Sequence, residues 1–211
     1  MTANKSSPSN TPRGDATRQR VLEAAERLMR EGSAEFSMRD LAAAAGVSFA
    51  TPFNQFGSKA AIMQALSAQR IDAMAARLAA AAPAGDASDR VLAAVDIAVA
   101  VMLEQPAVSR AVMGSLGTQG PEPGQVSARS RALWALALGK GEGLAPALAD
   151  LACRTLPDQL AIAFRGVLSF WTAGEIGDEA LAPRARAGAA TALLGFVEDG
   201  RRDGLIRLLR A

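Results

Sequence analysis

Apolar residues recur at helical spacing along almost the whole chain, and this periodicity limits the possible folds more than any other feature of the sequence. The first stripe is closed by Gly32 and consists of Val21, Leu22, Ala24, Ala25, Leu28 and Met29. No segment alternates polar and apolar residues as a half-buried strand does. The chain has 211 residues, of which 50% are apolar, so it can bury a sizeable core. The sequence therefore predicts an all-α protein.

Capping residues mark the short helices that follow the first stripe. Ser37 and Asp40 have the spacing of a capping box, and Gly46 is expected to end the helix that they open. Ser48 and Ser58 can each cap a further helix. Two short helices joined by Gly46, and preceded by a helix that can pack on both, meet the requirements of a helix-turn-helix.

Prolines and glycines divide the rest of the chain. The helix that Ser58 opens is expected to run to about Ala82, where Pro83 and Gly85 stop it and form a candidate domain boundary. Pro157 is expected at the start of a helix, the position that proline tolerates best. The helices predicted beyond the break cover about 91–102, 106–116, 126–138, 144–155, 157–176 and 179–198, with a loop at 117–124.

Composition limits the chemistry that the chain can perform. Histidine and tyrosine are absent and Cys153 is the only cysteine, which removes the commonest general base, the commonest metal ligand and any intrachain disulfide. We therefore expect no catalytic site, no metal and no cofactor. The net charge is only +2, so any site for a polyanion must be local.

Two observations bear on where the chain works. Residues 1–14 lack the apolar stretch of a secretory signal and are interpreted as a flexible arm. The longest apolar run, 91–103, is interrupted by Asp96 and is shorter than the roughly 20 residues that span a bilayer. We expect a cytoplasmic protein that does not enter the membrane.

One segment is free of charge although it lies within the motif. No formal charge occurs between Asp40 and Lys59, a region that includes the stretch GVSFATPFNQFGSK. This stretch belongs to an ordered series of elements between Arg20 and Ile62, which includes Ser-Met-Arg-Asp-Leu-Ala, Ala-Gly-Val-Ser, Phe-Asn-Gln-Phe and Ser-Lys. Over about residues 17–66 the series resembles the TetR family of transcriptional repressors. The resemblance implies a helix-turn-helix DNA-binding domain at 15–60 and a larger helical domain for effector binding and dimerisation at 61–211.

The resemblance also implies which residues touch DNA. Arg39 would approach a base or phosphate, and Lys59 would hold a phosphate. The contacts implied for the second motif helix are Ser48, Phe49, Ala50, Thr51, Phe53, Asn54 and Gln55. Two residues depart from the family pattern, because Phe53 replaces a usual tyrosine and Phe49 stands where polar or basic residues are frequent.

Physical chemistry supports some of these contacts and leaves alternatives open. A cation in the first turn of a helix opposes the helix dipole, so Lys59 suggests a bound anion, although it can also extend into solvent. Asn54 and Gln55 can bond adenine and the apolar residues can contact thymine methyl groups, but the amides can also form a solvated helix end. Phe56 is expected to be buried, whereas Phe53 can be either core or contact.

Basic residues near the amino terminus can supply the charge that the motif lacks. These residues are Lys5, Arg13, Arg18 and Arg20. They can follow the phosphates or enter the minor groove, or they can belong to a solvated tail.

The larger half contains residues that can line an apolar cavity, although they can equally form an ordinary core. The candidates for effector binding are Asp96, Met102, Met113, Trp134, Leu138, Phe164, Leu168 and Trp171. Asp96 shares a helix face with apolar residues and needs a partner, and a structural ion pair is favoured over a ligand contact. The arginines considered as its partner are Arg110, Arg131 and Arg165.

Small residues along the last long predicted helix favour close helix packing. The candidates for a dimer interface are Gly188, Ala189, Ala192 and Gly195. Two copies of this helix and the one before it would form a four-helix interface, whereas packing within one chain is the alternative.

The sequence thus favours a homodimeric repressor that binds a palindromic double-stranded DNA operator and is released by a small apolar or amphipathic effector. One alternative is a redox-sensing DNA-binding regulator that acts through Cys153. The other is a small helical enzyme that uses Cys153 or the carboxylates Asp96 and Glu104, with few chemical groups to support it.

Overall fold

The computed structural model describes residues 12–32, 35–116 and 125–210. The predicted loop at 117–124 and most of the predicted arm, with Lys5, lie outside the described residues. The described part of the chain is all-α, and its only extended pairing is an isolated antiparallel bridge between Leu144 and Val197. The chain divides into two compact units between Ile62 and Met63. This boundary lies inside one long helix and well before the break predicted at Pro83.

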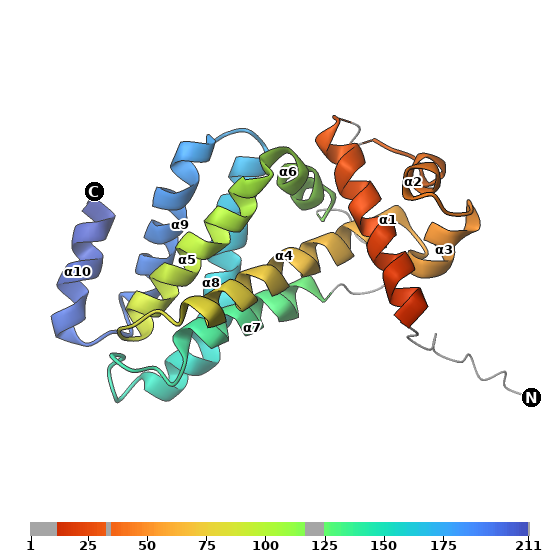
Figure 1. Cartoon of the computed structure of the whole chain (residues 1–211). Coiled ribbons are helices and arrows are strands. Elements are labelled where there is room, and N and C mark those ends of the chain that lie inside the picture. Colours follow the sequence, from red (N-terminus) through yellow and green to blue (C-terminus); the bar gives the residue numbers. More distant parts are fainter. Residues whose placement is uncertain (1–11, 33–34, 117–124, 211) are drawn as a thin grey trace, which may run out of the picture. The chain divides into compact units, whose positions relative to one another are not determined.

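In the described residues, the smaller unit contains three helices and the start of a fourth, which Figure 1 labels. These are α1 (Pro12–Arg30), α2 (Met38–Ala45), α3 (Ala50–Phe56) and α4 (Lys59–Ala81). The apolar stripe of α1 is buried, as are Leu41, Ala42 and Ala45 of α2 and Pro52 of α3. The predicted capping box of α2 is confirmed, and Gly46 ends this helix with a left-handed backbone at φ 62°.

In the described residues, the larger unit contains the rest of α4 and six further helices, which Figure 1 labels. They are α5 (Ala87–Glu104), α6 (Pro106–Ser115), α7 (Val126–Leu138), α8 (Ala149–Thr172), α9 (Asp178–Leu193) and α10 (Asp199–Arg210). α8 packs against α6, α7 and α9, and α5 packs against α7 and α9. Taken singly, none of the described helices is long and apolar enough to cross a membrane, and only the pair α5 and α6 passes that test together, with a bend of 101° between them.

Two predicted helix boundaries are wrong. Pro157 lies inside α8 instead of opening a helix, and residues 144–148 precede this helix instead of belonging to it. The Pro157 ring is buried, and the backbone carbonyl that the missing N–H would have bonded belongs to Cys153, an exposed residue that solvent can reach. Packing of the ring thus outweighs a hydrogen-bond loss that water can partly replace.

The last predicted helix, 179–198, is longer than the observed one, because α9 covers only Asp178–Leu193. α9 ends at Leu193 because the residues after it pair with the segment that precedes α8: Ala145 N–H donates to the carbonyl of Phe196 at 2.8 Å, and Glu198 N–H donates to that of Gly143 at 3.2 Å. The chain then begins α10, which the apolar pattern did not predict.

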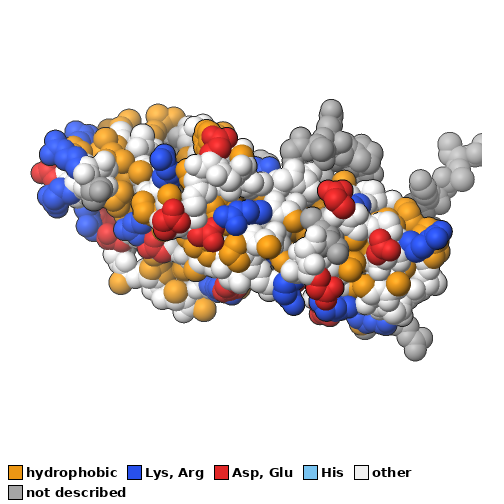
Figure 2. Space-filling view, turned by 90° about the horizontal axis from the view of Figure 1, so that it is seen from above, with side chains coloured by type: hydrophobic (Ala, Val, Ile, Leu, Met, Phe, Trp, Pro, Cys, Tyr) orange, Lys and Arg blue, Asp and Glu red, His pale blue; other side chains and the backbone are white. Residues whose placement is uncertain are grey.

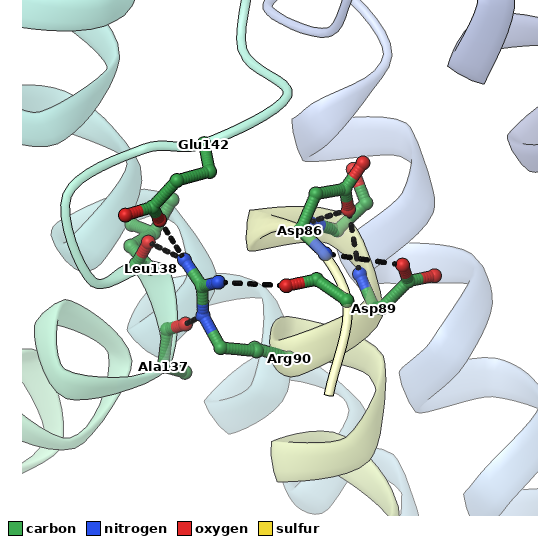
Figure 3. Close-up of polar contacts among 8 residues, drawn as sticks. Asp86, Asp89, Arg90, Ala137, Leu138 and Glu142 are labelled. Carbon is green, nitrogen blue, oxygen red and sulfur yellow. Dashed lines mark hydrogen bonds and ion pairs between the residues drawn. The ribbon is translucent and has the colours of Figure 1, made fainter. Parts of the chain in front are cut away.

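A polar network joins the start of α5 to the end of α7 (Figure 3). Asp86 caps α5 by accepting the backbone N–H groups of Ser88 and Asp89. Arg90 donates to the backbone carbonyls of Ala137 and Leu138 at 3.1 and 2.7 Å and pairs with Glu142. An arginine of α10, Arg201, pairs with both aspartates, and their negative charge raises its pKa. This network therefore fixes three elements of the larger unit to one another.

Candidate nucleic-acid interface

Three arginines of α1 hold the carbonyl ends of the two motif helices. Arg20 donates to the carbonyls of Ala45 and Gly46 at 2.9 and 3.0 Å, and Arg27 donates to that of Ala44 at 2.8 Å. A cation at the carboxyl end of a helix satisfies free carbonyls and is favoured by the helix dipole. These two arginines therefore stabilise the end of α2.

Arg18 has the same role at the end of α3. It donates to the carbonyl of Gln55 at 2.8 Å and lies 4.0 Å from the centre of the Phe56 ring, and partial burial lowers its pKa. Of the two readings left open for Arg18 and Arg20, the solvated tail is therefore wrong, because both belong to α1 and bond the motif helices. Spacing could have shown that Arg20 and Arg27 share one face of α1, but not that helix ends lie against that face.

The start of α2 places Arg39 beside Phe49, the N-cap of α3. The Ser37 hydroxyl accepts the backbone N–H of Asp40 at 3.2 Å, and the Asp40 carboxylate accepts the N–H of Ser37 at 2.9 Å. Hydrogen bonds from the backbone and then the side chain of Ser37 lower the pKa of Asp40. Arg39 is exposed in the first turn, with its guanidinium 5.8 Å from the centre of the Phe49 ring.

The start of α3 differs from the prediction. Phe49 is its N-cap, and the Ser48 hydroxyl bonds the Thr51 hydroxyl at 2.8 Å instead of capping the helix. The backbone N–H of Thr51 bonds the Ser48 carbonyl at 2.9 Å, so the helix begins with a tight turn of the 3₁₀ type. Pro52 lies in the first turn, where the absence of its N–H removes only one early bond.

The exposed face of α3 is apolar at one end and polar at the other. Phe49 is 55% exposed and Phe53 is 42% exposed, and their rings meet edge to face with centres 5.5 Å apart. Asn54 and Ala50 are exposed as well, whereas Thr51 and Gln55 are half-buried. Phe56, expected in the core, is only partly buried, and the Arg18 guanidinium lies over its ring. Of the predicted contacts on α3 and its N-cap, the larger side chains that are exposed are therefore Phe49, Phe53 and Asn54.

Lys59 has a partner within its own unit. Its ammonium donates to the carbonyl of Phe36 at 3.0 Å and lies 4.3 Å from the centre of the Phe36 ring. Ser58 caps α4, as predicted, by accepting the N–H of Ala61 at 3.1 Å. A carbonyl and an aromatic face thus stabilise this cation within its own unit, and its contact with a phosphate stays a prediction.

In the larger unit, most of the residues predicted to line an effector cavity are packed in the core. Those buried are Met102, Trp134, Leu138, Phe164, Leu168 and Trp171, while Met113 is partly buried. Trp134 packs edge to face on Phe164 at 5.5 Å, and its indole N–H is buried without a hydrogen-bond partner. The Trp171 indole instead donates to Asp178 at 2.8 Å, and Arg110 lies 4.4 Å above its ring. The two indoles therefore have opposite hydrogen-bonding states.

Asp96 is exposed and forms an ion pair with Arg186 of α9, so none of the three arginines considered for it is its partner. Arg110 pairs with Asp178 and Arg131 with Asp158. Sequence spacing placed Asp96 on a face of α5 but could not show that α9 packs beside it. The other carboxylate considered for catalysis, Glu104, pairs with Arg77, and this hydrogen bond lowers its pKa.

Arg165 has a different environment from the other arginines considered. It contacts the Met113 sulfur at 3.7 Å, and partial burial lowers its pKa.

A shallow apolar groove lies on α8 and α9, with a volume of about 450 Å³. Its lining consists of Leu151, Thr155, Leu156, Gln159, Ile162, Ala163, Gly188, Thr191, Ala192 and Phe196. Gly188 and Ala192 thus lie in the groove as small residues, beside Ile162, which is 64% exposed. Gly195 is exposed, but Ala189 is 3% exposed and belongs to the core of its own chain, so this residue is not available to a partner.

The remaining features that bear on function are the cysteine, possible metal ligands and the surface charge in the described part of the chain. Cys153 is a free, exposed thiol on α8. Among the described residues no three His, Cys, Asp or Glu side chains are grouped so that they could hold a metal ion. In Figure 2, positive and negative side chains are interspersed over the visible face, in agreement with a net charge of only +2.

Comparison with known proteins agrees with this geometry. Residues 21–66 match the model of the bacterial regulatory proteins of the tetR family. The structure is similar to that of a TetR transcriptional regulator from Rhodococcus sp. RHA1, with a TM-score of 0.68 and 25% identity over 85% of this chain and 97% of the other. It also has the fold of a gamma-butyrolactone receptor described as ArpA-like, with a TM-score of 0.53 and 15% identity over 94% of this chain and 96% of the other. No curated protein matches the chain. The matched segment contains α2, α3 and the α1 stripe that supports them, so the chain carries the domain of the bacterial regulatory proteins of the tetR family and has the fold of a TetR transcriptional regulator.

Proposed function

We propose that the protein is a homodimeric repressor, which binds a palindromic operator through α3 and leaves it when an apolar or amphipathic molecule binds the larger unit. The observation that carries this proposal is the exposed face of α3 within a segment that matches the TetR-family domain. Asn54 can form a bidentate contact with adenine, and Arg39 and Lys59 lie at the two ends of the motif, where phosphates would approach. The match to a family of regulators also leads us to infer that the chain is not an enzyme.

The apolar groove on α8 and α9 supports the dimer. Leu151 and Ile162 are exposed hydrophobic residues in this groove, and a second copy related by a two-fold axis would cover them. A two-fold dimer presents two α3 helices to two half-sites, which is why we expect a palindromic operator.

Substitution in the groove tests the dimer. We expect Ile162→Glu to produce a monomer in sedimentation velocity and to weaken operator binding, because the carboxylate would be buried in the interface. Leu136→Glu is the matched control, since Leu136 is 51% exposed on α7, outside the groove, and this variant should remain dimeric. If the unmodified protein is a monomer at micromolar concentration with and without operator, the dimer is refuted.

The unpaired indole N–H of Trp134 supports an effector that carries a hydrogen-bond acceptor. A buried donor without a partner is unfavourable by about 1–3 kcal/mol, and an acceptor on a bound molecule would recover this free energy. Arg165 is a second candidate contact, for an acidic group, because it is partly desolvated beside Met113.

Paired fragments test this effector chemistry. In Trp171→Phe, fluorescence comes from Trp134 alone, and acetophenone should perturb it at roughly tenfold lower concentration than ethylbenzene, which lacks the carbonyl. The acetophenone response should be lost when Trp134→Phe is measured through Trp171. If neither compound changes the fluorescence or the operator affinity, and a wider set of ketones and hydrocarbons fails as well, the effector proposal is refuted.

The operator itself is found by selection from random duplexes followed by footprinting. We expect a protected palindrome with its half-sites about one helical turn apart. Failure to select any sequence would refute the repressor proposal as a whole.

A further inference from the structure

Phe49 is the most exposed aromatic side chain in the described part of the smaller unit, and yet its ring is held from two sides. The Phe53 ring meets it at 5.5 Å with an interplanar angle of 63°, and the Arg39 guanidinium lies 5.8 Å from its centre. Phe49 is 55% exposed in spite of these contacts. A ring that is both oriented and exposed is suited to pack against a further apolar group.

We propose that Phe49 reads the C5-methyl group of a thymine in the operator, with Arg39 and Phe53 as positioning residues. This inference rests on the proposed binding of DNA through α3 and specifies which base the helix selects. Thymine is the only standard base that presents a methyl group in the major groove, and aromatic side chains are among its apolar partners.

The surroundings of Phe49 favour a base over a second protein as its occupant. The next residue, Ala50, is exposed and small, so a base edge can approach the ring closely. Arg39 places a cation beside the ring, which fits a methyl group that lies next to a phosphate. A protein surface with an apolar patch would not require this cation.

Asn54 adds information on the neighbouring base. It is exposed one turn beyond Ala50 on α3 and can bond adenine through its amide. With Phe49 in contact with a thymine methyl group and Asn54 bonded to an adenine, the helix should select A·T pairs at adjacent positions of each half-site.

The test replaces thymine by deoxyuridine, which removes only the methyl group. Each thymine of the selected operator is replaced in turn, and affinity is measured for the full-length protein. We expect one position in each half-site at which the loss is about fourfold, the value of one buried methyl group. Replacement at both half-sites should then reduce affinity about tenfold or more.

Protein variants show whether Phe49 is the group that senses this methyl. In Phe49→Ala, affinity for the thymine operator should fall about fourfold or more per half-site, and the difference between thymine and deoxyuridine should vanish. Arg39→Ala should reduce this difference without abolishing it, because the ring stays but is less well oriented. Asn54→Ala is the control, since it should weaken operator binding and leave the full difference. Circular dichroism should find Phe49→Ala folded, because the side chain is mostly exposed.

The outcomes separate this inference from the function on which it rests. An operator that tolerates deoxyuridine at every position overturns the inference alone. So does a Phe49→Ala variant that loses the same factor on thymine and deoxyuridine operators, because its ring would then contact the backbone only. Failure to select any operator overturns the repressor proposal and the thymine contact together.

Discussion

Arg20→Ala removes two hydrogen bonds at the junction of the motif, and it distinguishes a supporting role from a DNA contact. The guanidinium donates to the carbonyls of Ala45 and Gly46 at 2.9 and 3.0 Å, the last residue of α2 and its cap. Without it, these carbonyls depend on solvent. We therefore expect the variant to loosen the end of α2 and leave the phosphate contacts of the DNA complex unchanged.

The magnitude follows from the number and exposure of these bonds. A hydrogen bond to a charged group contributes about 1.5–3 kcal/mol when it is sheltered, and less when solvent screens the charge. Arg20 is exposed, so we expect the two bonds together to stabilise this part of the unit by about 1–2 kcal/mol. Arg27→Ala removes one bond, to Ala44, and should cost about half as much.

Amide hydrogen exchange of the full chain measures how much stability α2 loses in the variant. A loss of about 1–2 kcal/mol corresponds to roughly five- to thirtyfold faster exchange in α2, with α8 unaffected. Arg154→Ala is the control for removal of a charge, because Arg154 is an exposed arginine of α8, in the other unit. The slope of log K against log salt for DNA binding should be the same in Arg20→Ala and the unmodified protein.

The opposite pattern would refute this reasoning. If Arg20→Ala leaves exchange in α2 unchanged and lowers the salt slope by about one unit, then Arg20 binds a phosphate and the two carbonyls do not depend on it.

Further predictions concern the affinity for DNA and the cap of α2. Lys59→Ala should lower the salt slope by about one unit and also lower the melting temperature, since its bond to the Phe36 carbonyl is lost; an unchanged slope would exclude a phosphate contact. Phe53→Tyr should tighten operator and random DNA alike by adding a donor at the exposed ring edge, and a gain on the operator alone would contradict this. Asp40→Asn should lower thermal stability at neutral pH, because the lowered pKa of Asp40 means that its carboxylate stabilises the fold above the unfolded pKa of about 4. That difference should shrink as pH falls through the folded pKa, and a difference that persists at pH 2 would show that the charge of Asp40 is not responsible.

Local patterns predicted much of the motif correctly. The capping box of Ser37 and Asp40, the end of α2 at Gly46 and the cap of α4 at Ser58 all involve residues within a few positions of one another. Such contacts depend on side-chain chemistry and helix geometry, which the sequence carries directly. The same holds for α7, whose predicted and observed bounds agree at Val126–Leu138.

Patterns were less reliable where packing competes with local preference. Pro157 opens helices by its intrinsic preference, but burial of its ring in the core retains it inside α8. The stripe that continues past Leu193 looked like one helix, but pairing of Phe196 with Ala145 ends α9 early. Both outcomes depend on segments that the local pattern does not include.

The sequence by itself determined an all-α chain with a TetR-type reading motif, because helical periodicity and caps act over a few residues. Only the tertiary structure decided which side chains remain free to act. It directed Arg20 to the end of α2, paired Asp96 with Arg186 and placed Ala189 in the core, while it left Phe49 exposed. Spacing assigns a residue to a face of its helix, but the angle at which a distant helix crosses that face decides whether the residue is buried, paired or exposed.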